Sequence, residues 1–319
     1  MFQLSLDDVS FIGQGLHRPE CVLTTKQGDL FVSDSRGGIS TLRADGTQDL
    51  IKANGVPEGF LPNGIALTPD RAFLIANLSD DGGVWRMDQN GDATLLLDKI
   101  DGEPMPPVNF VGLDRTGRIW ITYSTRLQPR EGAMKKGWAD GFIAVLDDRG
   151  ARIVADGIGY TNEAIVDPSG QWLYVNETVA RRTIRFPIGA NAELGEREVV
   201  AAYPPATFPD GFTFDSEGGV WCVSVASNRI IHVDHDGKQT IVLEDSDPER
   251  MQVVADAFDN DSFRREHIDA GKERSLKNIA SIAVGGTDLK TDYLGSLFGD
   301  VIATFRAPVA GAPPVQWQF

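Results

Sequence analysis

The chain repeats one pattern of apolar and polar positions. Each copy but the last opens on a polar residue, and each runs through about four mostly apolar residues to a turn built on Asp, Pro, Ser or Gly. A second apolar run follows with Trp or Phe-Leu near its start, then a Gly- or Asn-containing turn, then a third apolar run. Short apolar runs bounded by such turn residues predict β-strands joined as hairpins.

Six copies of the pattern fit the sequence. They begin at Glu20, Asn63, Asn109, Asn162, Asp210 and Ala280. The first five starts lie 43 to 53 residues apart, close to the ~40–50 residues of a propeller blade. The last gap is longer, at 70 residues. We therefore predict an all-β fold, a six-bladed β-propeller that takes up residues 1–319 as a single domain. The apolar stretch 9–16 is expected to close the ring as the outer strand of the last blade.

Two insertions interrupt the repeat. One spans 125–141 inside the third copy, and the other spans about 244–277. The second contains DPERMQVVADAFDND, in which Met251, Val254 and Phe258 recur at helical spacing and Asp247 precedes the first turn. This pattern predicts a helix capped by Asp247. The insertion is either a lid over a functional site or a patch on the propeller's side.

Composition narrows the class of partner. The net charge of −16 and the pI of about 4.6 disfavour nucleic acid and anionic membrane surfaces and leave a small-molecule substrate as the expected partner. The N-terminal MFQLSLDDVS carries acids where a signal peptide is basic, and no long apolar run follows. We expect a cytoplasmic protein, either monomer or homodimer, with Cys21 and Cys222 as buried free thiols.

The starting residues of the copies suggest a metal site. The first residue of each innermost strand faces the central funnel of a propeller, and Glu20, Asn109, Asn162 and Asp210 occupy that register in four different blades, with Asn63 in the same register of another. Two carboxylates and two amides form a hard oxygen set suited to one divalent cation. A single Asn or Asp here is also typical of a turn. Glu20 in Pro-Glu-Cys and Asn109 in Val-Asn-Phe are not turn sequences, so their shared register favours the metal.

These features resemble the family of senescence marker protein, gluconolactonase and luciferin-regenerating enzyme. The resemblance runs from PECVL at Glu20 to SIAVGGTDLKTDYLGSL near the end, and FPDGFTFDSEGGVWCVSVASNRIIHV is its most specific blade. It implies that Glu20, Asn109, Asn162 and Asp210 hold a divalent ion. Calcium is favoured, with zinc, magnesium, manganese or iron as alternatives.

The resemblance also implies a reaction, the hydrolysis of a sugar-acid or related hydroxy-acid lactone. In it the metal polarises the carbonyl and Asp210 acts as the base. The candidates for contact with the substrate are Glu163, Asn109 and Asn63, although Asn63 and Glu163 each have a structural alternative, a turn or a neighbouring strand.

Two departures from the sugar lactonases leave the substrate open. Glu163 stands where they have Gly, and Pro106, Pro107 and Val108 stand where an arginine often precedes the second anchor. The alternatives are hydrolysis of another ester, such as a phosphotriester or an aryl lactone, and a non-catalytic binding propeller with a structural ion.

Overall fold

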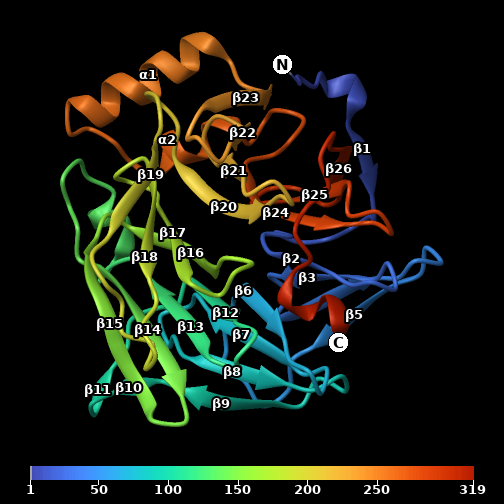
Figure 1. Ribbon diagram of the computed structural model, residues 1–319, viewed down its shortest axis with the longest axis vertical. Coiled ribbons are helices and arrows are strands. Elements are labelled where there is room, and N and C mark those ends of the chain that lie inside the picture. The colour runs from blue at the N-terminus through green and yellow to red at the C-terminus, as the bar shows by residue number, and fades with distance from the viewer. Residues whose placement is uncertain (1) are drawn as a thin grey trace.

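The computed structural model describes residues 2–319 and shows six four-stranded antiparallel sheets arranged around a central axis (Figure 1). This confirms the predicted six-bladed β-propeller. The first three blades comprise β2 (Val22–Thr24), β3 (Leu30–Asp34), β4 (Gly38–Leu42) and β5 (Gln48–Lys52); β6 (Pro62–Leu67), β7 (Phe73–Asn77), β8 (Val84–Met87) and β9 (Ala93–Leu97); and β12 (Phe110–Leu113), β13 (Ile119–Tyr123), β14 (Gly141–Asp147) and β15 (Gly150–Ile158). A small hairpin of β10 (Lys99–Ile100) and β11 (Glu103–Pro104) joins blades two and three.

The last three blades complete the ring, and both ends of the chain contribute to the sixth. Blades four and five are β16 (Thr161–Val166), β17 (Trp172–Glu177), β18 (Arg182–Pro187) and β19 (Glu198–Ala202); and β20 (Pro209–Phe214), β21 (Val220–Ser224), β22 (Arg229–Val233) and β23 (Gln239–Glu244). Blade six is β24 (Ile279–Gly285), β25 (Thr291–Ser296), β26 (Ile302–Arg306) and, outermost, β1 (Ser10–Ile12). Because β1 pairs antiparallel with β26, the ends of the chain are joined by backbone hydrogen bonds.

The insertion after β23 is helical, as predicted. It forms α1 (Pro248–Asp259), α2 (Arg265–Ile268) and η3 (Asp269–Gly271). The Asp247 side chain accepts hydrogen bonds from the backbone amides of Glu249 and Arg250, so it is the cap of α1. The insertion between β13 and β14 is mostly irregular with one short turn, η2 (Arg130–Ala133). Two further turns, η1 (Leu6–Asp8) and η4 (Val315–Gln318), lie near the two ends of the chain.

The two insertions share one apolar cluster with the propeller. Met251, Val254 and Phe258 of α1 are buried, as their spacing predicts. They pack with Ala133 and Met134 of the other insertion and with the loops that lead into blades four and five. In Figure 1, α1 is the orange helix at the upper left. Neither insertion packs independently of the other.

Apolar side chains fill the space between adjacent blades. One cluster joins Trp120 and Ile143 of blade three to Leu173 and Val175 of blade four, and all four are nearly inaccessible. Cys21 and Cys222 are buried free thiols, as predicted. No helix within residues 2–319 has the length and apolar character needed to cross a membrane.

Candidate functional site

The residues that begin the inner strands come together at one end of the central channel. In blades two, four and five the pairing of the inner strand is irregular directly at the anchor, between Pro62 and Ile65, Thr161 and Ala164, and Pro209 and Phe212. These bulges release the anchors Asn63, Asn162 and Asp210 from the strict alternation of a paired strand. With Glu20 and Asn109 they form a group that we name the anchor ring, and all five residues are buried.

Hydrogen bonds link the members of the anchor ring across blades. Asn109 Nδ2 donates to Asn162 Oδ1 at 2.9 Å, and Asn63 Nδ2 donates to the backbone oxygen of Asn109 at 2.7 Å. Arg18 Nη2 donates to Asn63 Oδ1 at 2.9 Å and forms an ion pair with Glu20. Arg18, which the sequence did not single out, therefore links the anchors of blades one and two, and the asparagines link those of blades two to four.

The acids of the anchor ring are held in an unfavourable setting for negative charge. Burial and then the Glu20 carboxylate raise the pKa of Asp210 well above its ordinary value. Asp210 is 6% exposed and Glu20 is 8% exposed. Two buried carboxylates close enough to repel each other favour a positive charge between them.

Glu163 follows the anchor Asn162 and lines the channel on the side of the anchor ring away from Arg18. Its Oε2 accepts a hydrogen bond of 3.3 Å from the amide of Phe212 in β20 of the adjacent blade. A Cβ added to Gly211 would lie 2.9 Å from Glu163 Oε1, so the glycine of blade five leaves room for this carboxyl. Burial and then the charge of Asp210 raise the pKa of Glu163 well above its usual range. The predicted contact between Glu163 and substrate stays a prediction.

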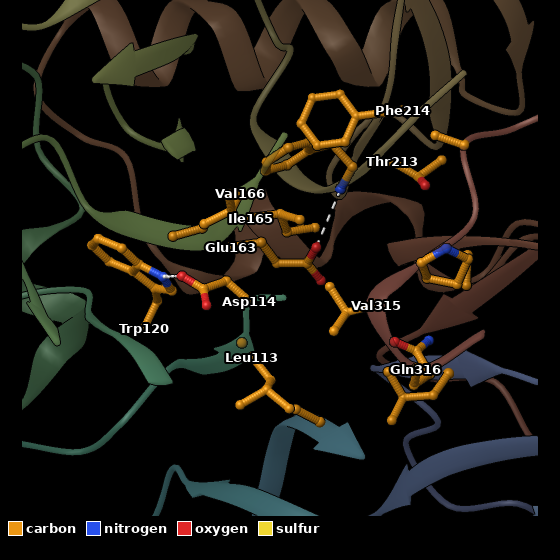
Figure 2. Close-up of a pocket in the computed structure, with 18 of the residues that line it drawn as sticks. Leu113, Asp114, Trp120, Glu163, Ile165, Val166, Thr213, Phe214, Val315 and Gln316 are labelled. Carbon is orange, nitrogen blue, oxygen red and sulfur yellow. Dashed lines mark hydrogen bonds between the residues drawn. The ribbon is translucent and has the colours of Figure 1, made fainter. Parts of the chain in front are cut away.

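A cavity of about 170 Å³ occupies the channel beyond Glu163. Its walls are mainly the apolar inner strands, with Leu113, Ile165 and Phe214 among them, and Val315 and Gln316 of the C-terminal segment border it. Figure 2 shows Glu163 pointing into this space with Val315 opposite. The carboxyl of Glu163 therefore separates the polar anchor ring from an apolar channel.

The opposite mouth of the channel is polar. A cavity of about 260 Å³, which we name the arginine cavity, is lined there by Arg18, Arg130 and Arg265 with Gln128 and Pro107. Arg130 comes from the 125–141 insertion and Arg265 from the 244–277 insertion. Burial and then the nearby charges lower the pKa of Arg18 from its ordinary value, even though Glu20 opposes the shift. Both insertions thus contribute side chains to the mouth beside the anchor ring.

The anchor ring fits a divalent cation by the chemistry of its donors. Its members Glu20, Asn109, Asn162 and Asp210 offer carboxylate and amide oxygens, the donors that calcium and magnesium prefer. Glu20 Oε2 is buried and has no hydrogen-bond partner besides its ion pair with Arg18. Within residues 2–319, no three His, Cys, Asp or Glu side chains are grouped so that they could hold a metal by themselves. A metal at the anchor ring would therefore also need the amide oxygens of Asn109 and Asn162.

The sequence alone did not identify the arginines. Arg18 lies two residues before an anchor, and Arg130 and Arg265 lie in insertions outside the repeat. The one signal available was that both insertions contain arginine while the anchors of the repeat do not.

Known proteins share both the sequence pattern and the architecture. An uncharacterized protein of Sulfolobus acidocaldarius is 23% identical over 217 residues, which are 66% of this chain and 72% of that protein. A gluconolactonase from Xanthomonas campestris superposes with a TM-score of 0.69 at 19% identity, covering 94% of this chain and 89% of the other. A calcium-binding regucalcin from Agrobacterium tumefaciens superposes with a TM-score of 0.67 at 18% identity, covering 97% and 98%.

The two structural likenesses establish the propeller fold. The sequence match is more specific, because residues 18–246 match the family described as the SMP-30/Gluconolactonase/LRE-like region. That stretch contains the whole anchor ring, Arg18 and all of blades one to five. The chain belongs to the SMP-30/gluconolactonase/LRE-like family.

Proposed function

We propose that this protein is a divalent-metal-dependent lactonase that opens the cyclic ester of a sugar acid or a related hydroxy acid. The observation that carries the proposal is the anchor ring, where the buried acids Glu20 and Asp210 share one end of the channel with amide donors. Family membership and the likeness to a gluconolactonase and a calcium-binding regucalcin support it.

Glu20, Asn109, Asn162 and Asp210 would hold the cation, with calcium as the favoured ion. A divalent cation bound there supplies positive charge that polarises an ester carbonyl and stabilises the oxyanion formed on it. The side chains of Asn109 and Asn162 are hydrogen-bonded to each other and Asn63 bonds the Asn109 backbone oxygen, so these amides are positioned before any ligand arrives. Such preorganisation lowers the cost of arranging charge during the reaction.

Asp210 is the proposed base. It takes a proton from water as the water oxygen bonds to the carbonyl carbon; the ring C–O bond then breaks and the leaving alkoxide takes the proton. The products are a hydroxyl and a carboxylic acid, which loses its proton to the solvent to become the carboxylate, and no other reactant is needed. We expect Asn63 and Asn109, which lie at the same end of the channel, to contact the substrate.

The test is proton release from a panel of lactones by the purified protein, before and after treatment with a chelator. We expect turnover of at least one lactone, loss of the rate on chelation and recovery when calcium is added back. Turnover of phosphotriesters but no lactones would replace the proposed reaction with the alternative ester hydrolysis. A melting temperature that falls on chelation, without turnover of any ester, would favour a structural ion in a binding propeller.

A further inference from the structure

The arginine cavity is placed to hold part of a substrate whose reacting end lies at the anchor ring. Arg18 borders both, because its guanidinium contacts Asn63 and Glu20 of the ring and also lines the cavity. The cavity is about 260 Å³, comparable to the space a small ring compound with one substituent occupies. Leu61, Leu78 and Pro107 give it apolar sides, so the arginines are its main hydrogen-bond donors.

The guanidiniums are incompletely neutralised. Arg18 Nη1 is buried without a hydrogen-bond partner. Arg265 is paired with Asp269 at 2.8 Å, whereas Arg130 forms no salt bridge to any residue within 2–319. Arg18, Arg130 and Arg265 line the same cavity. Arg18 is paired with Glu20 and Arg265 with Asp269, so the Arg130 guanidinium and the free Nη1 of Arg18 are the donors left for an added anion.

The acids in the same lining do not cancel these charges. Asp80 and Glu131 border the cavity, but both are exposed, while all three arginines are partly buried. Interactions of exposed charges are weakened by water and salt, and those of partly buried charges are weakened less. The interior of the cavity therefore remains a site for an oxyanion.

We propose that the arginine cavity binds an anionic substituent, so that the substrate is a lactone carrying a carboxylate or a phosphate away from its ring ester. Guanidinium groups bind both oxyanions through paired N–H donors. The inference rests on the proposed lactonase function and specifies the class of its substrate. The arginines come from the two insertions and from the residue before Pro19, and the repeat itself supplies none.

The first experiment measures kcat/KM for three lactones on one six-carbon chain: gluconolactone, glucarolactone and phosphogluconolactone. Their terminal carbons carry a hydroxyl, a carboxylate and a phosphate. We expect at least one charged lactone to exceed gluconolactone by about tenfold or more, and the one preferred identifies the oxyanion. Arg130→Gln should reduce that preference by about fivefold or more. If neither charged lactone is preferred, the inference is wrong.

Matched variants separate the cavity from general charge effects. Lys135→Gln removes one exposed positive charge from the same insertion outside the cavity lining, and it should leave the charged-to-neutral ratio unchanged. An equal loss of preference in Lys135→Gln and Arg130→Gln would overturn the role of the cavity. Arg265→Gln provides a second cavity variant if Arg130→Gln does not fold, as judged by its melting curve.

A binding measurement keeps the inference separate from catalysis. Calorimetric titration of the wild-type protein with gluconate, glucarate and phosphogluconate requires no turnover. Glucarate or phosphogluconate should bind about tenfold tighter than gluconate, and Arg130→Gln should remove the difference. Tighter binding of the charged acids without turnover of any lactone would support the anion site in the arginine cavity and reject the lactonase function. Turnover of lactones with equal binding of all three acids would retain the lactonase and reject the cavity.

Discussion

Two sets of buried acids behave in opposite ways in this propeller. Asp114 and Asp215 follow the inner strands β12 and β20, and each is 3% exposed. Asp210 and Glu163 lie in the channel and are 6% and 8% exposed. The pKa values of the first two lie below the ordinary value, and those of the second two lie well above it.

The four side chains are almost equally inaccessible to solvent, but Asp210 and Glu163 lie deeper in the protein, and the two sets also differ in their hydrogen-bond donors. Burial alone would raise the pKa of Asp114, but donors from Thr116, Trp120 and Arg118 outweigh it. Trp221 and His232 make equivalent contacts to Asp215 at 3.2 and 2.8 Å. We name Asp114 and Asp215 the turn acids. They accept several hydrogen bonds each, which stabilises the fold, whereas the channel acids have fewer donors, as expected of groups that bind a ligand.

Asp210→Asn should produce the largest effect. The substitution keeps the shape of the side chain but removes its capacity to accept a proton and its charge. We expect lactone turnover to fall by about 1000-fold or more, with weakened calcium binding and little loss of folding stability. The measurements are kcat/KM on the preferred lactone, calcium titration and urea unfolding. Asp288→Asn, an exposed acid of blade six, is the control, and full activity in Asp210→Asn would reject the assignment of Asp210 as base.

Asp114→Ala should have the reverse profile, with a loss of stability. It leaves the Trp120 N–H, the Arg118 guanidinium and the amide of Thr116 without their acceptor. Removing one partner of a buried charged network costs about 3 kcal/mol. Urea unfolding at neutral pH measures it. Asp45 is an exposed acid that accepts a hydrogen bond from Thr47, and Asp45→Ala should lower the free energy of unfolding much less. Equal losses in both variants would mean that burial does not determine the role of the turn acids.

Asp292, a buried acid of β25, tests whether burial without hydrogen-bond donors raises the pKa of a carboxyl away from the anchor ring. Burial raises the pKa of Asp292 to about 7 from an ordinary value of 3.8, with Asp215 adding to the shift. Between those values the unfolded chain loses this proton while the folded chain keeps it, so stability falls as pH rises. Asp292→Asn should increase the free energy of unfolding by about 2–4 kcal/mol at pH 8 and leave it unchanged at the acid end of the window.

Thermal or urea unfolding at several pH values measures this effect. Asp288→Asn is the matched control, because pairing with Arg306 lowers the pKa of Asp288 to about 2 and its removal should not stabilise the protein at pH 8. If Asp292→Asn gives the same stability change at all pH values, Asp292 does not titrate in this window.

Much of this organisation could be predicted from the sequence, because the repeat is local. Each copy specifies its own hairpins, so six blades and the position of the anchors follow from spacing. The helix with its Asp247 cap was recognisable for the same reason. Glu163 could not be placed from the sequence, because the bulge between Thr161 and Ala164 breaks the alternation that says which way a strand residue faces. The lining by Arg130 and Arg265 depends on how two insertions far apart in sequence pack on each other, which no local pattern encodes.

Thr116→Ala should give the smallest effect and shows how the turn acids obtain their low pKa. The Thr116 hydroxyl donates to Asp114 Oδ1 at 2.7 Å. Because the pKa of Asp114 is depressed, the stability it contributes is present above the unfolded pKa and is lost as pH falls through the folded pKa. Loss of one donor costs about 0.5–1 kcal/mol at neutral pH and moves the acid-unfolding midpoint to higher pH. Urea and acid titrations measure both, with Thr94→Ala as the control, since its hydroxyl bonds a backbone oxygen and no carboxylate. An unchanged acid midpoint in Thr116→Ala would assign the low pKa of Asp114 to its remaining donors, which are the Arg118 and Trp120 side chains and the backbone amides.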